Sequence, residues 1–402
     1  MKILTINYHF SNNYGAIYEA YALQNFLSKN YCADTCCIDF QFNNRLGLGM
    51  TIFRLWKAVR HPRIAKRYLK KTIQLLKKDN NYLETQSSKL TSNCHVFNNF
   101  REKHLKITKK KYLTIADLYN CGVLNDVDIV ICGSDVIWNI SNESLVVGAY
   151  FLAWVPDSIM KVAYAPSWGK PNIDDLNHQM KEKIKYYLSR FDYISVREES
   201  GIEICASLGY LNTKWVPDPT MLLTVDEWNM IAEPLCDEEF SYVLNYRIPY
   251  NSAVNPYNIL RMLHLQLNIP VINIPDTERE EVWVPPAKWL GAIRNATFVV
   301  TNSFHGVVFC LLYHKEFIFT ELTEEFTNHN ERIYSLLGLF DLKKRIVSQK
   351  TVDNNKIIDN LINKKIAWHD VEAKIQEWRQ VGIDFLDDTL KKVAQKKKCS
   401  KS

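Results

Sequence analysis

The sequence predicts an α/β protein of two domains in which parallel strands alternate with helices. Its 402 residues are too many for one ordinary hydrophobic core and suit two domains of standard size. Short β-branched and aromatic runs alternate with segments of helical periodicity along most of the chain, which is the pattern of βαβ units. Hydrophobic residues make up 47% of the sequence, enough to fill two buried cores.

The first half of the chain supplies strands separated by helical patterns. A helix is predicted over residues 16–28, because Ala20, Leu23 and Leu27 fall on one face at helical spacing. The strands are predicted over residues 2–8, 35–40, 128–132, 161–165 and 193–196.

The second half repeats this organisation after the turn Pro217-Asp218-Pro219, where two prolines interrupt the chain. Its strands are predicted over residues 242–246, 271–274, 297–300 and 316–320. A final helical stretch over 351–394 leads into a Lys-rich tail that we expect to be disordered. The predicted units are an N-terminal domain of residues 1–216, a C-terminal domain of residues 217–345, and helices with the tail over residues 346–402.

A basic helical insertion is predicted at about residues 45–115 of the first domain. Between Phe40 and Lys78 the chain has no acidic residue, and its Lys and Arg residues alternate with apolar ones that include Trp56. A basic amphipathic helix of this kind suits an anionic membrane surface, although an insertion packed on the domain with a solvated cationic face explains the same residues. No zinc-finger, RNA-binding or recognition-helix pattern accompanies the charge, so we expect no nucleic-acid partner.

The remaining composition excludes several classes of protein. No apolar run approaches the roughly 18–20 residues of a membrane span, and the first residues do not form a signal peptide. The ten cysteines include no CxxC pair and no Cys/His spacing typical of zinc. We therefore expect a reduced, cytoplasmic protein without a metal site.

One histidine follows a predicted strand at a position where such folds bind ligands. The strand over 297–300 ends in Thr301-Asn302-Ser303-Phe304-His305-Gly306, and a helical pattern follows. Open α/β sheets bind ligands at the carboxyl ends of their strands, and the free N–H groups of a helix N-terminus favour anions. His305 therefore faces a predicted crevice, although a hydrogen-bonded core histidine would give the same pattern.

Three other strand ends carry polar residues toward the same kind of edge. Asn13 and Gly15 follow the first strand and suit a tight turn or an anion contact at a helix start. Asp135 follows the strand at 128–132, where it either accepts a proton from a sugar hydroxyl or caps a helix. Arg197 follows the strand at 193–196, where it either binds a carboxylate or phosphate or pairs with Glu198, Glu199 or Asp218.

Taken in order, these motifs resemble those of the polysaccharide pyruvyl transferase family, from the first strand to about Leu342. The motifs are Asn13-Tyr14-Gly15-Ala16, Gly133-Ser134-Asp135-x-x-Trp138-Asn139, Ala163-Tyr164-Ala165-Pro166-Ser167-Trp168-Gly169, Ser195-Val196-Arg197-Glu198, Pro217-Asp218-Pro219-Thr220, Thr301-Asn302-Ser303-Phe304-His305-Gly306, and Asn330-Glu331-Arg332-Ile333 with Ser335-Leu336-Leu337-Gly338-Leu339. Each motif is weak by itself, and the series is fairly specific.

The resemblance implies two Rossmann-like domains facing across a cleft, an arrangement called glycosyltransferase-B-like. It also implies transfer of the enolpyruvyl unit of phosphoenolpyruvate, a co-substrate used without a further cofactor, onto two sugar hydroxyls to form a ketal. The first domain would bind the acceptor and the second the donor. His305 would be the acid or base, Asp135 a supporting catalytic group, and Arg197 the anion anchor, with Asn13, Gly15, Asn302 and Ser303 as binding residues.

The acceptor implied by the resemblance is a sugar unit of a capsule or exopolysaccharide precursor on a lipid carrier at the inner membrane face. The basic insertion suits peripheral contact with that face. One position departs from the family pattern, because Ser303 stands where some members have an arginine two residues before the histidine. Arg247 and Arg332 are the candidates to replace that missing cation.

Two other functions fit the same sequence. The first is a glycosyltransferase that uses a nucleotide-sugar, because the same pair of domains serves both chemistries. The second is a non-catalytic protein that binds a polysaccharide-assembly complex through the basic helix.

Overall fold

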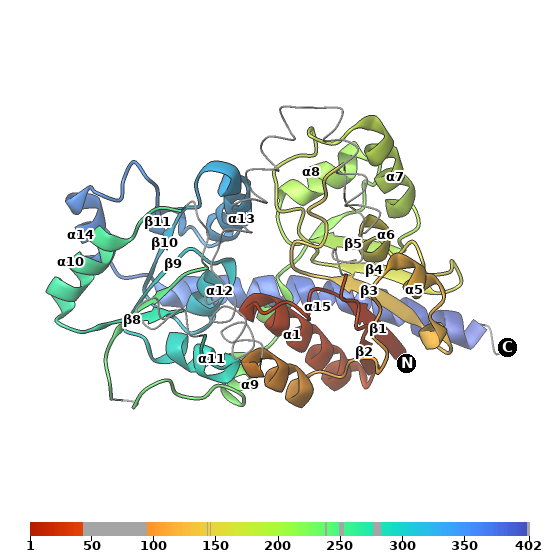
Figure 1. Cartoon of the computed structure of the whole chain (residues 1–402), viewed down its shortest axis with the longest axis horizontal. Coiled ribbons are helices and arrows are strands. Elements are labelled where there is room, and N and C mark those ends of the chain that lie inside the picture. The colour runs from red at the N-terminus through yellow and green to blue at the C-terminus, as the bar shows by residue number, and fades with distance from the viewer. Residues whose placement is uncertain are drawn as a thin grey trace, which may run out of the picture.

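The computed structural model has the predicted α/β fold, with a parallel sheet in each of two lobes (Figure 1). It describes residues 1–42, 95–142, 144, 146–237, 239–248, 253–275 and 283–399. Most of the basic insertion predicted at about residues 45–115 lies outside the described residues; within it, residues 95–104 are helical. Among the helices described, none combines the length and the apolar character that crossing a membrane requires.

The first lobe is built on a six-stranded sheet of order β2-β1-β3-β4-β5-β6, with every neighbouring pair parallel. Its strands are β1 (Lys2–Ile6), β2 (Asp34–Cys37), β3 (Ile129–Gly133), β4 (Met160–Tyr164), β5 (Tyr193–Val196) and β6 (Lys214–Trp215). Its helices are α1 (Tyr14–Tyr31), α5 (Ile115–Tyr119), η2 (Gly122–Leu124), α6 (Val147–Tyr150), α7 (His178–Leu188) and α8 (Ser200–Ser207).

The second lobe has a five-stranded parallel sheet of order β11-β10-β9-β7-β8. Its strands are β7 (Val243–Tyr246), β8 (Val271–Ile274), β9 (Phe298–Thr301), β10 (Phe317–Thr320) and β11 (Ile346–Val347). The helices in this half are η3 (Pro219–Met221), α9 (Val225–Asn229), α10 (Tyr257–Leu267), α11 (Pro286–Asn295), α12 (Phe304–Leu312), η4 (Glu324–Asn330), α13 (Glu331–Leu339), η5 (Lys343–Arg345) and α14 (Asn355–Asn363). Every strand predicted from the sequence is present, with small shifts at the ends.

Both sheets change the direction of their strand order at an equivalent place. In the first lobe β1 lies between β2 and β3, and in the second lobe β7 lies between β8 and β9. Such a switch point leaves a crevice at the carboxyl ends of the two inner strands, because the helices that follow them cover opposite faces of the sheet. The fold therefore provides two crevices, one in each lobe.

Helix α1 joins the lobes into one continuous core. Tyr14 stacks on Trp289 of α11 with ring centroids 5.0 Å apart, and Tyr18 packs edge-to-face on Phe309 of α12 at 5.4 Å. The Tyr14 hydroxyl also donates to the carbonyl of Val284 at 2.7 Å. Buried aromatic pairs of this kind add to the free energy of area burial, so the lobes are held together by apolar packing around α1.

The long helix α15 (Trp368–Cys399) passes behind both lobes and returns the chain to the first (Figure 1). Trp378 packs on Trp215 at the edge of the first sheet, with ring centroids 4.9 Å apart. Arg379 donates to the carbonyls of Met221 and Leu223, in the segment that connects the lobes. The expectation of a disordered Lys-rich tail is wrong as far as Cys399, because α15 continues through it.

Candidate active site

A cavity of about 220 Å³ lies between the lobes, at the carboxyl ends of both sheets. It is lined by Tyr8, Ser11, Asn13, Asp135 and Val136 from the first lobe and by Ile248, Asn302, Ser303, Phe304, His305, Phe319, Leu322, His329, Arg332 and Ile333 from the second. Apart from Phe319, which lies within β10, these residues follow β1 and β3 on one side and β7, β9 and β10 on the other. The two switch points therefore open into one shared site.

His305 lies in the first turn of α12, at the wall of this cavity. Ser303 caps the helix by accepting a hydrogen bond from the amide of Gly306 at 3.3 Å. The imidazole packs against Gly15 of α1, where a Cβ atom would lie 1.9 Å from Nδ1 of His305. A glycine is therefore required at position 15 for the second lobe to place this ring against the first.

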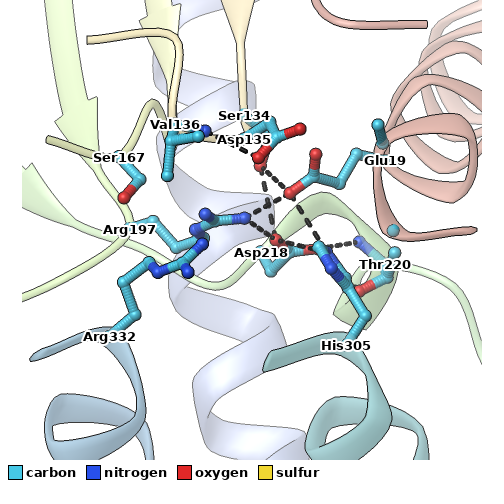
Figure 2. Close-up of polar contacts among 12 residues, drawn as sticks. Glu19, Ser134, Asp135, Val136, Ser167, Arg197, Asp218, Thr220, His305 and Arg332 are labelled. Carbon is cyan, nitrogen blue, oxygen red and sulfur yellow. Dashed lines mark hydrogen bonds and ion pairs between the residues drawn. The ribbon is translucent and has the colours of Figure 1, made fainter. Parts of the chain in front are cut away.

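Behind His305, two buried carboxyl groups share the same donors (Figure 2). Oε1 of Glu19 accepts from Nε2 of His305 at 3.1 Å, from Oγ of Ser134 at 2.8 Å and from Nη1 of Arg197. Oδ2 of Asp218 lies 2.8 Å from the same Arg197 nitrogen and 3.4 Å from Nε2 of His305. Side chains from α1, α12 and the ends of β3 and β5 thus meet at one cluster.

The geometry of the cluster shifts the charge states of its members. Burial and the nearby carboxylate of Asp218 raise the pKa of Glu19 to about 8. Burial alone would raise the pKa of Asp218, but the charges of His305 and Arg197 hold it well below its ordinary range. Burial alone would lower the pKa of His305, but Glu19 and Asp218 raise it to about 9. His305 is therefore an imidazolium, and a proton donor, at neutral pH.

Asp135 reaches the cavity because the chain after β3 makes an unusual turn. Ser134 and Asp135 both have left-handed backbones, with φ of 50° and 54°, and the Ser134 amide donates to the carbonyl of Tyr164 at 3.0 Å. Left-handed backbones cost free energy for residues other than glycine, and such strain is common at functional sites. The turn directs Ser134 into the buried cluster and Asp135 to the cavity wall.

The predicted anion anchor Arg197 is not among the residues that line the cavity, and its role toward an anion stays a prediction. Its side chain is 1% exposed, and Nη1 contacts both Glu19 and Asp218. Its Cζ also lies 4.5 Å from the ring centre of Phe304, a residue that lines the cavity. The cause is charge compensation, because two buried carboxyl groups need a cation beside them. Of the ion pairs considered from the sequence, the one with Asp218 is present.

Of the two cations proposed to replace the missing arginine, the structure places only Arg332 at the cavity. Arg332 lines the cavity, and its guanidinium carbon lies 5.7 Å from the ring centre of Phe304. Arg247 is not among the lining residues, and it donates to the carbonyl of Val254 at 2.9 Å. Burial and the charge of Arg332 lower the pKa of His329, another lining residue, to about 4.

The small polar residues predicted to bind substrate mainly shape the site. Asn13 caps α1 by accepting from the amide of Gly15 at 2.8 Å. The Asn302 amide joins the ends of β9 and β7, accepting from the backbone N–H of Ile248 at 2.8 Å and donating to its carbonyl at 3.0 Å. Asn13, Asn302 and Ser303 nevertheless border the cavity, while Gly15 provides clearance for His305.

Glu19 was missed by reasoning from sequence. It is the one acidic residue in α1 and lies one helical turn after Gly15, inside a helix whose other neighbours are apolar. A carboxyl group in such a face must be paired or hydrogen-bonded when buried, so its position was a usable signal.

The same cluster has the spacing of a metal site, because ligand atoms of Glu19, Asp218 and His305 all lie within 4.8 Å of one another. A cation already lies between the carboxyl groups, since Nη1 of Arg197 contacts both. We therefore assign no metal to this cluster.

Comparison with known proteins gives one family. The family model for polysaccharide pyruvyl transferase matches residues 13–322, which include every residue of the cluster. No curated protein matches the sequence.

Solved structures with a similar fold share only 11–12% sequence identity with the chain. They include Staphylococcus aureus MnaA with UDP (TM-score 0.49, covering 94% of this chain and 91% of that one) and the Neisseria meningitidis UDP-GlcNAc 2-epimerase bound to UDP-GlcNAc (0.48, 96% and 100%). Acinetobacter baumannii MurG is also similar (0.45, 96% and 99%).

Proposed function

Because the chain belongs to the polysaccharide pyruvyl transferase family, we propose that this transferase uses phosphoenolpyruvate to build a ketal on a sugar of a cell-surface polysaccharide precursor. The observation that carries the proposal is the cavity itself, which combines a protonated His305 and Arg332 with the N-terminus of α12. Cations and helix N-termini favour anions, and phosphoenolpyruvate is a small molecule with a phosphate and a carboxylate.

The size of the cavity supports this donor over a nucleotide-sugar. Sites for drug-sized ligands usually span roughly 300–1,000 Å³. The cavity, at about 220 Å³, suits a three-carbon phosphorylated acid and is small for a nucleotide joined to a sugar. The reaction also needs no further cofactor, because the donor carries its own leaving group.

The proposed chemistry assigns one proton transfer to His305. Its imidazolium gives a proton to the methylene carbon of the donor, and a sugar hydroxyl oxygen bonds to the adjacent carbon. The bond from that carbon to the phosphate oxygen then breaks, and a second hydroxyl of the sugar takes the place of phosphate. The two hydroxyl protons balance the step, since one restores His305 and the other leaves with phosphate.

We assign Asp135 a supporting role on the acceptor side, since it lines the cavity from the first lobe. A carboxylate there accepts the proton of the attacking hydroxyl and passes it on to the departing phosphate, so that Asp135 ends the reaction unprotonated. The acceptor on a lipid carrier stays a prediction from the sequence. Contact of the basic segment with anionic lipid also stays a prediction, and vesicle flotation would test it.

The donor is tested by supplying the purified protein with phosphoenolpyruvate or nucleotide-sugars, together with pooled acceptors. We expect phosphate release with the first donor and no nucleotide release with the second. Release of nucleotide without release of phosphate would support the glycosyltransferase function and contradict the proposal.

The anion contact is tested with Arg332→Ala. Loss of one charge-assisted contact costs roughly 1.5–3 kcal/mol, so KM for phosphoenolpyruvate should rise about tenfold to hundredfold. Arg261→Ala is the matched control, because Arg261 lies exposed on α10 and bonds only to Asn258 among the described residues. Equal KM values for the two variants would exclude Arg332 as the donor contact.

A further inference from the structure

We propose that Glu19 is the positioning residue for His305: with Asp218, it holds the Nε2 proton and leaves Nδ1 as the nitrogen that serves the cavity. The inference rests on the proposed role of His305 and deepens it. Glu19 never touches substrate in this arrangement, because its side chain is 1% exposed and His305 lies between it and the cavity.

The hydrogen bonds of the ring decide which of its two nitrogens keeps a proton when the ring is neutral. Nε2 of His305 lies 3.1 Å from Oε1 of Glu19 and 3.4 Å from Oδ2 of Asp218. Asp218, whose pKa is held well below its ordinary range, is an ionised carboxylate that only accepts hydrogen bonds. Glu19 becomes one above about pH 8, before His305 loses its proton, so the pair fixes Nε2 as a donor when the ring is neutral. Nδ1 has no hydrogen-bond partner among the described residues, and the ring lies against the bare Cα of Gly15, where a Cβ atom would be only 1.9 Å from Nδ1.

Glu19 is itself held in place by groups that follow two strands, β3 and β5. Ser134 at the end of β3 donates to Oε1 at 2.8 Å, and Arg197 after β5 contacts the same oxygen. Asp218 is fixed independently, since its Oδ1 accepts from the amide of Thr220 at 2.9 Å and from the Thr220 hydroxyl at 2.6 Å. The carboxyl pair is therefore a rigid support for the ring.

The charges around His305 make the arrangement selective for imidazolium. Two carboxyl groups, Glu19 and Asp218, face one guanidinium, that of Arg197. Once Glu19 ionises, above about pH 8, a protonated His305 balances the second negative charge. The other charged or titratable groups that line the cavity beside the ring are Tyr8, Asp135, His329 and Arg332. Removal of the Glu19 charge leaves a buried cation excess that only loss of a proton from His305 can relieve.

The test is an NMR titration of ¹⁵N-histidine-labelled full-length protein, with the His305 signal assigned by its loss in His305→Asn. In the wild-type protein we expect His305 to titrate above the ordinary histidine range and to keep its proton on Nε2 when neutral. Glu19→Gln preserves the shape and can still accept from Arg197. It should lower the His305 pKa by about 1–2 units, the usual effect of removing one close opposite charge.

Glu227→Gln is the matched control. Glu227 also lies against α1, where it pairs with Lys29, but it contacts no member of the cluster. The inference is overturned if both variants shift His305 equally, or if the neutral wild-type ring carries its proton on Nδ1. The second measurement needs no variant and stands even if Glu19→Gln fails to fold.

The pH dependence of kcat gives an independent test of the role of Glu19. The alkaline limb of the kcat profile should move to lower pH in Glu19→Gln by the same amount as the NMR pKa, with little change in KM for phosphoenolpyruvate. If phosphoenolpyruvate is not a donor, the proposed function fails while the NMR titration still decides the role of Glu19.

Discussion

Two buried histidines of this protein have the same shifted pKa and very different surroundings. His9 follows β1 and His305 follows β9, and contacts with acidic neighbours raise the pKa of each to about 9 although burial alone would lower it. In His9 both ring nitrogens are occupied, Nδ1 lying 3.3 Å from Sγ of Cys37 and Nε2 lying 3.3 Å from Oδ1 of Asp39. In His305 only Nε2 has a hydrogen-bond partner among the described residues, and the ring borders the cavity.

The comparison shows that a shifted pKa does not identify a catalytic group by itself. His9 anchors the loop that carries Ser11 and Asn13 to the cavity wall, and Arg101 fixes the same loop by donating to the carbonyl of His9 at 2.7 Å and to that of Phe10 at 2.9 Å. What distinguishes His305 is access, together with a nitrogen that has no partner in the described part of the chain.

The largest expected effect separates the two histidines by activity. His305→Asn should lower kcat for phosphate release by about 10²–10⁴-fold, the usual contribution of a general acid. His9→Asn should lower it less than about tenfold, because its ring stabilises a loop and transfers no proton. Circular dichroism checks that both variants are folded.

Equal losses in the two variants would end the distinction between a catalytic and a structural histidine. Unchanged polymer production by cells carrying His305→Asn would instead favour the non-catalytic binding function.

The fold was predictable from sequence because its signals are local. Parallel strands such as β5 and β8 are short runs rich in β-branched and aromatic residues, and their predicted ends agree with the structure. Strands β6 and β11 were missed because each has only two residues, too few to show a period.

The site was predictable only in part, because its partners come from distant parts of the chain. His305 could be placed at a strand end, but its contact with Glu19, 286 residues away, depends on how the lobes pack. For the same reason Arg197 was expected to meet a ligand, whereas the fold gives it two carboxyl groups. Strand-end position indicates which edge a residue reaches, and not which neighbour satisfies its charge.

A smaller effect on activity is expected from crowding His305 without replacing it. A Cβ atom at position 15 would lie 1.9 Å from Nδ1 of His305, so Gly15→Ala must displace the ring. Misplacement of a catalytic group by about 1 Å can cost about 10²-fold in rate, and we expect a loss in kcat of that order. Gly122→Ala is the control, because a Cβ there meets nothing within 4 Å. A Gly15→Ala enzyme as active as Gly122→Ala would show that His305 need not lie against α1.

The smallest effect on activity, and the clearest on stability, comes from His9. Its pKa is about 9 in the folded protein and near 6.5 when unfolded, so folding favours the protonated ring. The stabilisation is complete below about pH 6.5, is lost as the pH rises through about 9, and reaches about 3 kcal/mol at most. The difference in free energy of unfolding between wild type and His9→Asn should therefore be large at pH 6 and much smaller at pH 10, as measured by urea denaturation. A difference that does not change with pH would mean that the His9–Asp39 contact is not an ion pair, and the likeness between the two histidines would then end at their burial.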